Sequence, residues 1–111
     1  EEHKKWFSRT LKSKYSTIYI YEEVLETRMN KPVASMRIDN IDNRNFLSWN
    51  VSKRMRNKGI GAKMLNNFIN ENKGKYFAKI RSDNFASLAI CSKSGFHKYY
   101  SKEDISYWRN F

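Results

Sequence analysis

The amino-acid sequence predicts a mixed α/β domain with a mostly antiparallel sheet, flanking helices and one parallel crossover. Short segments rich in β-branched and aromatic residues, such as residues 17–22, are typical of strands. Apolar residues between positions 60 and 69 recur at helical spacing. A strand–helix–strand succession over residues 46–81 implies a crossover between two parallel strands. The 111 residues allow one hydrophobic core, so we expect a single domain over residues 1–111.

The first half of the chain is expected to hold one helix and then three strands. Trp6, Phe7, Thr10 and Leu11 share a helical face, which predicts an amphipathic helix over residues 1–13. Polar segments at residues 23–31 and 39–44 separate the strands that follow, and we expect these strands to form an antiparallel meander. The three predicted strands cover residues 17–22, 33–38 and 46–51.

The second half is expected to alternate helices with strands. A long helix begins near Gly59, and Gly74 marks the end of the segment that contains it. A strand at residues 76–81 follows, and then a helix over residues 84–94 that Gly95 closes as a C-cap. Two closing strands are expected at residues 96–100 and 105–108. The buried face of the long helix is predicted from its periodicity to comprise Ile60, Met64, Leu65, Phe68 and Ile69.

Composition is that of a globular protein, and it leaves the high charge open to two interpretations. Hydrophobic residues make up 40% of the chain, and no apolar run is long enough to span a bilayer. Cys91 is the only cysteine, which excludes an internal disulfide and favours the cytoplasm. No cluster has metal-ligand spacing, so we expect no metal. The net charge of +11 indicates either a polyanionic partner or a generally solvated basic surface.

A basic segment before two glycines is the strongest candidate site. Residues 53–58 read Lys-Arg-Met-Arg-Asn-Lys, and Gly59 and Gly61 then open the long helix. The free amides of a first helical turn, aided by the helix dipole, bind anions. Glycine removes the β-carbon that would hold a phosphate away from the backbone, and Arg56 and Lys58 add charge-assisted contacts. The alternative is that the glycines only give the start of the helix conformational freedom and that this segment binds no ligand.

Three phosphate-binding patterns can be compared with this segment. The Walker loop requires Gly-x-x-x-x-Gly-Lys-Ser/Thr, which the sequence lacks. The dinucleotide pattern fails because Met64 occupies its third small position. The pattern Arg-x-x-Gly-x-Gly/Ala does match residues 56–61, Arg-Asn-Lys-Gly-Ile-Gly. This segment resembles motif A of the GNAT superfamily of acetyltransferases.

A second segment, residues 80–96, resembles motif B of the same superfamily. That motif is a strand followed by Asn-x-x-Ser, a short helix and Lys-x-Gly-Phe, and it is matched at Asn84, Ser87, Lys93, Gly95 and Phe96. Two motifs in the right order carry more weight than either one alone. The resemblance covers about residues 33–100. More loosely, residues 2–11 resemble a helix of bacterial members that acetylate amino sugars on nucleotide carriers.

The resemblance implies a coenzyme A site and direct acyl transfer. The pantetheine arm would lie between the strands at residues 46–51 and 77–81, and a backbone N–H near Asn50 or Val51 would polarise the thioester. Cys91 stands where family members commonly carry a tyrosine that protonates the leaving thiolate. It is the acid, a buried spacer, or a sign that water supplies this proton. The implied cofactor-binding residues are Val51, Arg56, Asn57, Lys58, Gly59, Ile60, Gly61, Ala62, Asn84, Ser87 and Lys93.

The expected function is therefore transfer of an acetyl group from acetyl-CoA to a primary amine, such as an amino-sugar nucleotide. The acceptor is a small molecule or a protein amine, and a homodimer is left open. Neither a membrane nor a nucleic acid is expected as a partner. Two alternatives remain: a degenerate member that binds coenzyme A without catalysis, and a basic nucleic-acid- or ribosome-binding module. The strand and helix that begin the GNAT fold are expected to be missing.

Overall fold

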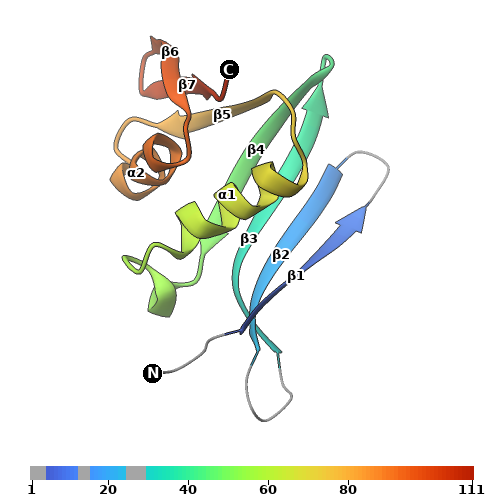
Figure 1. Cartoon of the computed structure of the whole chain (residues 1–111). Helices are drawn as coiled ribbons and strands as arrows, with labels where there is room; N and C mark the ends of the chain where they lie inside the picture. Colours follow the sequence, from blue (N-terminus) through green and yellow to red (C-terminus); the bar gives the residue numbers. More distant parts are fainter. Residues whose placement is uncertain (1–4, 13–15, 25–29) are drawn as a thin grey trace.

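The chain folds around one seven-stranded sheet, shown in Figure 1 as a computed structural model that describes residues 5–12, 16–24 and 30–111. The strand order is β1-β2-β3-β4-β5-β7-β6, and all neighbours are antiparallel except β4 and β5. The predicted fold class is confirmed. The strands are β1 (Lys5–Lys12), β2 (Ser16–Val24), β3 (Asn30–Ile41), β4 (Arg44–Val51), β5 (Tyr76–Arg81), β6 (His97–Lys102) and β7 (Ile105–Arg109), and the helices are the 3₁₀ turn η1 (Lys53–Met55), α1 (Ile60–Glu71) and α2 (Phe85–Lys93).

The helix predicted over residues 1–13 is wrong for Lys5–Lys12, and the rest of that range lies outside the described residues. Lys5–Lys12 instead form the edge strand β1, paired with β2 from Lys5 opposite Val24 to Lys12 opposite Thr17. A short segment with several apolar residues fits either a helix or a strand, and the hydrogen bonds offered by β2 select the strand. The side chains of Trp6 and Phe7, on which the helical prediction depended, lie outside the described part of the chain.

The turn between β3 and β4 is tighter than predicted. Residues 39–44 were expected to form a polar turn, but Ile41 pairs with Arg44 and the strands run up to them. Asp42 and Asn43 alone reverse the chain, with φ of 52° and 63°. A two-residue turn with both φ values positive matches the twist of its strands, and Asp and Asn tolerate that conformation. The predicted antiparallel meander is thus confirmed, with longer strands.

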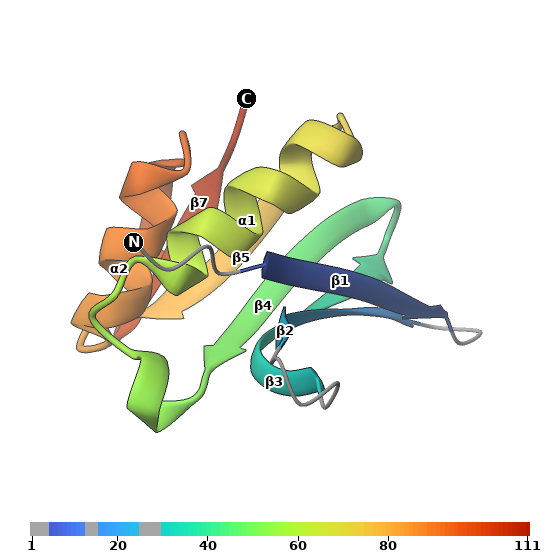
Figure 2. The ribbon, with the colours of Figure 1, turned by 60° about the horizontal axis from the view of Figure 1, so that its bottom comes forward.

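Both helices pack on the same face of the sheet, side by side in Figures 1 and 2. The predicted buried face of α1 is confirmed at Ile60, Met64, Leu65 and Phe68, while Ile69 is only partly buried. These residues share one core with side chains from the sheet and from α2, namely Tyr19, Tyr21, Val33, Ala34, Met36, Leu47, Ala78, Ile80 and Cys91. Within the described residues, no helix is long and apolar enough to cross a membrane.

The parallel strands β4 and β5 separate soon after they pair. Their register runs only from Asn45 opposite Tyr76 to Leu47 opposite Ala78. Beyond that point β4 continues to Val51 and β5 to Arg81, and Figure 1 shows the two strands diverging. The gap between them opens beside the N-terminal half of α1 and beside α2. This divergence positions the candidate site.

Candidate functional site

A groove of about 660 Å³ lies where β4 and β5 diverge. It is lined by the end of β4, the loop that contains η1, the first turn of α1 and one side of α2. Every residue that the two motifs assign to the cofactor lines this groove, except Lys58, which is exposed. The groove also has walls that the motifs did not indicate, formed by Trp49, Met55, Ala86, Ala89 and Ile90. These residues could have been found from the alternation of side chains along β4 and from the helical spacing around the second motif, which place them on the same sides as the motif residues.

The N-terminus of α1 opens directly into the groove. Gly59 is the N-cap and has no side chain to cap the helix. The first helical bond is from the Lys63 N–H to the Gly59 carbonyl at 3.1 Å. The amides of Ile60, Gly61 and Ala62 therefore have no carbonyl within the helix, and all three residues line the groove. Since α1, described throughout, has no acidic residue in its first turn, this end attracts anions.

The two glycines of the motif are required for different reasons. Gly59 has φ 75° and ψ 9°, and a β-carbon on it would meet nothing within 4 Å, so its backbone conformation is the constraint. Gly61 is buried, and a β-carbon there would collide with Ile90 Cδ1 and lie 3.2 Å from Val51 Cγ2. Gly61 thus lets α2 and the end of β4 approach α1. This is a packing role that the phosphate pattern alone did not reveal.

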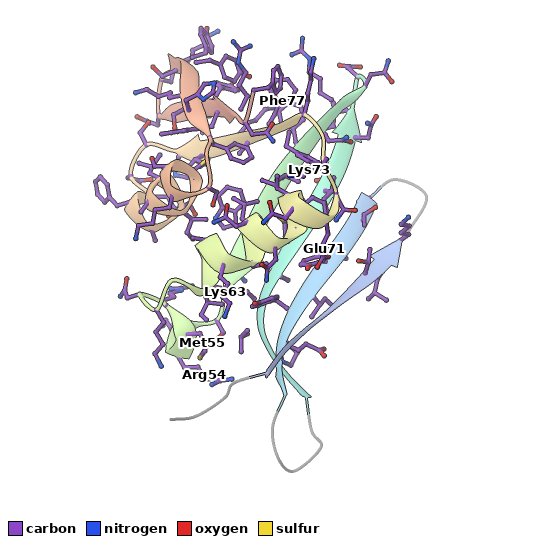
Figure 3. The ribbon with its side chains drawn as sticks, in the orientation of Figure 1. Arg54, Met55, Lys63, Glu71, Lys73 and Phe77 are labelled. Atoms are coloured by element: carbon purple, nitrogen blue, oxygen red, sulfur yellow. The ribbon has the colours of Figure 1, made fainter. Side chains whose placement is uncertain are left out.

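The loop before α1 is fixed by Arg56 and contributes positive charge. Arg56 Nε donates to the Val51 carbonyl at 3.1 Å, which ties the loop back to the end of β4. Asn57 reverses the chain with φ 63°. Lys93, in the last turn of α2, supplies a second cation to the wall. In Figure 3, Arg54 and Met55 of η1 lie at the end of the molecule that also holds Lys63 on α1.

The strand register decides which amides of β4 are free. The Ser52 N–H bonds to the Val33 carbonyl at 2.8 Å, which marks a hydrogen-bonded pair with β3. Such pairs alternate along an antiparallel ladder, so Asn50 also directs its N–H toward β3. Trp49 and Val51 direct theirs toward the gap that β5 has left. The free amides that face this gap are therefore those of Trp49 and Val51, and the amide of Asn50 does not face it.

A second hollow of about 180 Å³ lies between the diverging strands and shares Trp49, Asn84 and Ser87 with the groove. Lys79 and Arg81 of β5 contribute positive charge to its walls. Among the described residues that line the two hollows, none carries a carboxylate or an imidazole. Trp49 lines both hollows, and its indole Nε1 is buried and finds no hydrogen-bond partner within the described ranges.

Asn84, expected to contact the cofactor, and Cys91, expected to be either the acid or a buried spacer, lie in different environments. Asn84 Oδ1 accepts a hydrogen bond from the Ser87 N–H at 3.2 Å, so Asn84 is the N-cap of α2 while it also lines the groove. Cys91 is fully buried beneath α2 and lines neither hollow. Burial raises the pKa of the Cys91 thiol to about 12.

Comparison with known proteins identifies solved structures that share this fold. No protein-family model matches the sequence, and no curated protein matches it. Solved structures do match: ribosomal-protein-S5-alanine acetyltransferase from Vibrio fischeri has 16% identity and a TM-score of 0.68, covering 86% of this chain and 61% of that one. N-acetyltransferase PseH from Campylobacter jejuni, in complex with acetyl coenzyme A, has 12% identity and a TM-score of 0.67, covering 87% and 68%.

A third match is a protein described as a GnaT-family acetyltransferase from Bordetella pertussis, at 15% identity and a TM-score of 0.68, covering 86% of this chain and 66% of that one. This chain has the GNAT fold. It spans between 61% and 68% of the length of these three solved chains. The expected mostly antiparallel sheet with one parallel pair is confirmed, and it contains a further strand, β1, in the segment that was predicted to be a helix.

Proposed function

We propose that the chain is an acetyl-CoA-dependent N-acetyltransferase domain. The observation that carries this proposal is that two motifs separate in the sequence line one groove, at the point where the parallel strands diverge. The groove begins at free helix amides, which suit a pyrophosphate. Solved neighbours of the same fold, PseH and the microcin C7 self-immunity acetyltransferase MccE, are described in complex with acetyl-CoA, which supports the same co-substrate here.

In this proposal each part of coenzyme A has a counterpart in the groove. The pyrophosphate lies against the amides of Ile60–Ala62, with Arg56 and Lys93 as cationic neighbours. The pantetheine arm extends between β4 and β5, where β4 has no strand partner. The thioester carbonyl accepts a hydrogen bond from the Val51 amide, one of the two amides that the sequence indicated, because the other one, that of Asn50, faces β3. A donor of this kind contributes about 3 kcal/mol to the transition state.

The chemistry proposed is direct attack of a neutral amine on the thioester. The amine nitrogen bonds to the carbonyl carbon, the carbon–sulfur bond breaks, and coenzyme A leaves as a thiolate. The described walls hold no carboxylate or imidazole, so water takes the ammonium proton and protonates the thiolate. Cys91 serves as a buried spacer. Such a site favours an amine with a pKa of about 8, as for an α-amino group, over one near 10.4, as for lysine.

The acceptor is proposed to be an amine carried on an anionic molecule, such as an amino-sugar nucleotide. Acceptors vary widely on this fold, since the solved neighbours include a spermidine N-acetyltransferase and a ribosomal-protein-S5-alanine acetyltransferase. Local charge is therefore the better guide. Lys79 and Arg81 line the small hollow beside the proposed thioester position, and although Arg81 pairs with Asp83, the positive charge that remains attracts a phosphate or carboxylate and repels a polyamine.

A degenerate member that binds coenzyme A without transfer is the second candidate. The buried position of Cys91 and the lack of a base in the described walls favour it. Calorimetric titration with acetyl-CoA, followed by thiol release with matched amines that carry or lack a phosphate, separates the candidates. We expect saturable binding, and release that is faster with the phosphorylated amine. Binding of acetyl-CoA without thiol release would support the degenerate member that binds coenzyme A without transfer. Absence of acetyl-CoA binding would exclude both candidates.

Replacing Cys91 by alanine tests the spacer role. Because the thiol does not line the groove, we expect kcat to change less than about threefold, whereas loss of a true general acid costs about 10²–10⁴. In the native wild type, iodoacetamide should fail to label Cys91 at pH 8, since the thiol is fully buried and its pKa is raised to about 12. Labelling should appear in urea. A large kcat loss with an unchanged Tm would instead make Cys91 the acid.

A further inference from the structure

The face of the sheet opposite the helices carries a cluster of aromatic rings. Leu47 and Ala78 turn toward the core, so strand alternation places their neighbours Phe46 and Phe77 on the other face. These two rings have centroids 5.4 Å apart. Phe77 also contacts Tyr99 and Phe111, and Tyr107 contacts Tyr99 and Tyr100. We call this set the aromatic platform: Phe46, Phe77, Tyr99, Tyr100, Tyr107 and Phe111.

Four cations lie over the rings of the platform. The Arg109 Cζ atom lies 4.9 Å from the ring centroid of Tyr99 and 5.2 Å from that of Phe111. The Lys79 Nζ atom lies 5.1 Å from the ring centroid of Phe46 and 5.8 Å from that of Tyr107. The other two pairs are Arg44 over Phe77 and Lys75 over Phe111. None of these cations forms a salt bridge within the described part of the chain, where the ion pairs are Arg37–Asp39 and Arg81–Asp83.

The platform is accessible and shares no residue with the groove, while its cation Lys79 also lines the small hollow beside the groove. Tyr99, Tyr100 and Phe111 are exposed by 39%, 51% and 42%, and exposed apolar side chains that form one patch indicate an interaction site, whereas scattered ones do not. Figure 3 shows Phe77 at the opposite end of the molecule from Arg54 and Met55, which flank the groove loop. Exposed rings, with cations over them that form no salt bridge within the described part of the chain, make a surface for a ligand with both flat apolar groups and negative charge.

We propose that the aromatic platform binds single-stranded RNA. Bases stack on the exposed rings, and phosphates lie near the four cations, so one ligand uses both features. Three of the rings are tyrosines, whose hydroxyls can hydrogen-bond the ribose 2′-hydroxyl. An acidic peptide would leave the rings unused. A second copy of the chain would bring together two molecules with a net charge of +11 each.

Fluorescence anisotropy with a labelled RNA of about 12 nucleotides tests this proposal at low salt. Tyr99→Ala should weaken binding about fivefold or more, because it removes one stacking surface, while Tyr99→Phe should keep most of the affinity. Phe85→Ala is the matched control, since Phe85 is 76% exposed on α2 and lies off the platform. Arg44→Gln should lower the slope of log affinity against log salt by about one, and Arg54→Gln should not.

Several outcomes would overturn the proposal. These are no saturable RNA binding at low salt, equal losses in Tyr99→Ala and Phe85→Ala, or equal affinity for DNA of the same sequence. Binding to vesicles of anionic lipid without RNA binding, or dimerisation that Tyr99→Ala abolishes, would assign the platform to another occupant. Thermal unfolding of each variant confirms that it is folded. Acetyl-CoA titration of the same variants should be unchanged, which keeps this test separate from the proposed transferase function.

Discussion

Replacing Gly61 by leucine is expected to abolish acetyl-CoA binding and to lower the free energy of unfolding. The site has no room for a side chain, because even a β-carbon would collide with Ile90 Cδ1 and crowd Val51 Cγ2. Overpacking of this kind costs about 1–3 kcal/mol for one or two added groups and more for a leucine. The displaced helices would also close or distort the groove that Gly61, Ile90 and Val51 line together. Calorimetry with acetyl-CoA and urea unfolding measure the two effects.

A double-mutant cycle separates packing from ligand contact at this position. Gly61→Ala alone should destabilise the fold, since Ile90 must shift. In an Ile90→Ala background only the close approach to Val51 Cγ2 remains, and Gly61→Ala should become nearly neutral, because the higher helix propensity of alanine, up to about 1 kcal/mol, offsets it. The coupling should therefore lie in the range of about 0.5–3 kcal/mol found for residues in contact. A coupling near zero would mean that α2 does not press on Gly61.

Arg56→Ala is expected to weaken acetyl-CoA binding by about tenfold or more with little effect on stability. Arg56 holds the loop to β4 through its bond to the Val51 carbonyl and brings its charge to the groove. Hydrogen bonds to charged groups contribute about 1.5–3 kcal/mol, which corresponds to this loss of affinity. The effect should nearly disappear for pantetheine, which lacks the phosphates. Calorimetric titration with both ligands measures the difference.

Lys58 and Arg54 are the controls for this prediction. Lys58 belongs to the same sequence motif, yet it is exposed and does not line the groove; Arg54 is an exposed cation of η1 nearby. Lys58→Ala and Arg54→Ala remove the same charge and should each change acetyl-CoA affinity by less than about threefold, as expected for surface charges. If all three variants lost affinity equally, general charge rather than groove geometry would explain the binding.

The sequence predicted the parts of this protein that depend on local spacing. The buried face of α1 follows from apolar residues at a period of 3.6, and β5 was predicted with its observed bounds from six residues between turn signals. The groove residues followed from two motifs, because a glycine opening a helix and an Asn-x-x-Ser N-cap are local arrangements of backbone donors. Each of these features is decided within about ten residues of chain.

Only the tertiary structure decided features that depend on partners distant in the sequence. Residues 5–12 became a strand because β2 offered a complete ladder, which their own composition did not indicate. The sequence motif predicts that Gly61 contacts a phosphate, and only the position of Ile90 on α2 shows that Gly61 also lets α2 pack closely against α1. The register with β3 directs the Asn50 N–H away from the gap. Cys91 is buried outside the groove because of the way in which α2 packs on the sheet. Hydrogen-bond direction and burial are properties of pairs of elements, and no single segment encodes them.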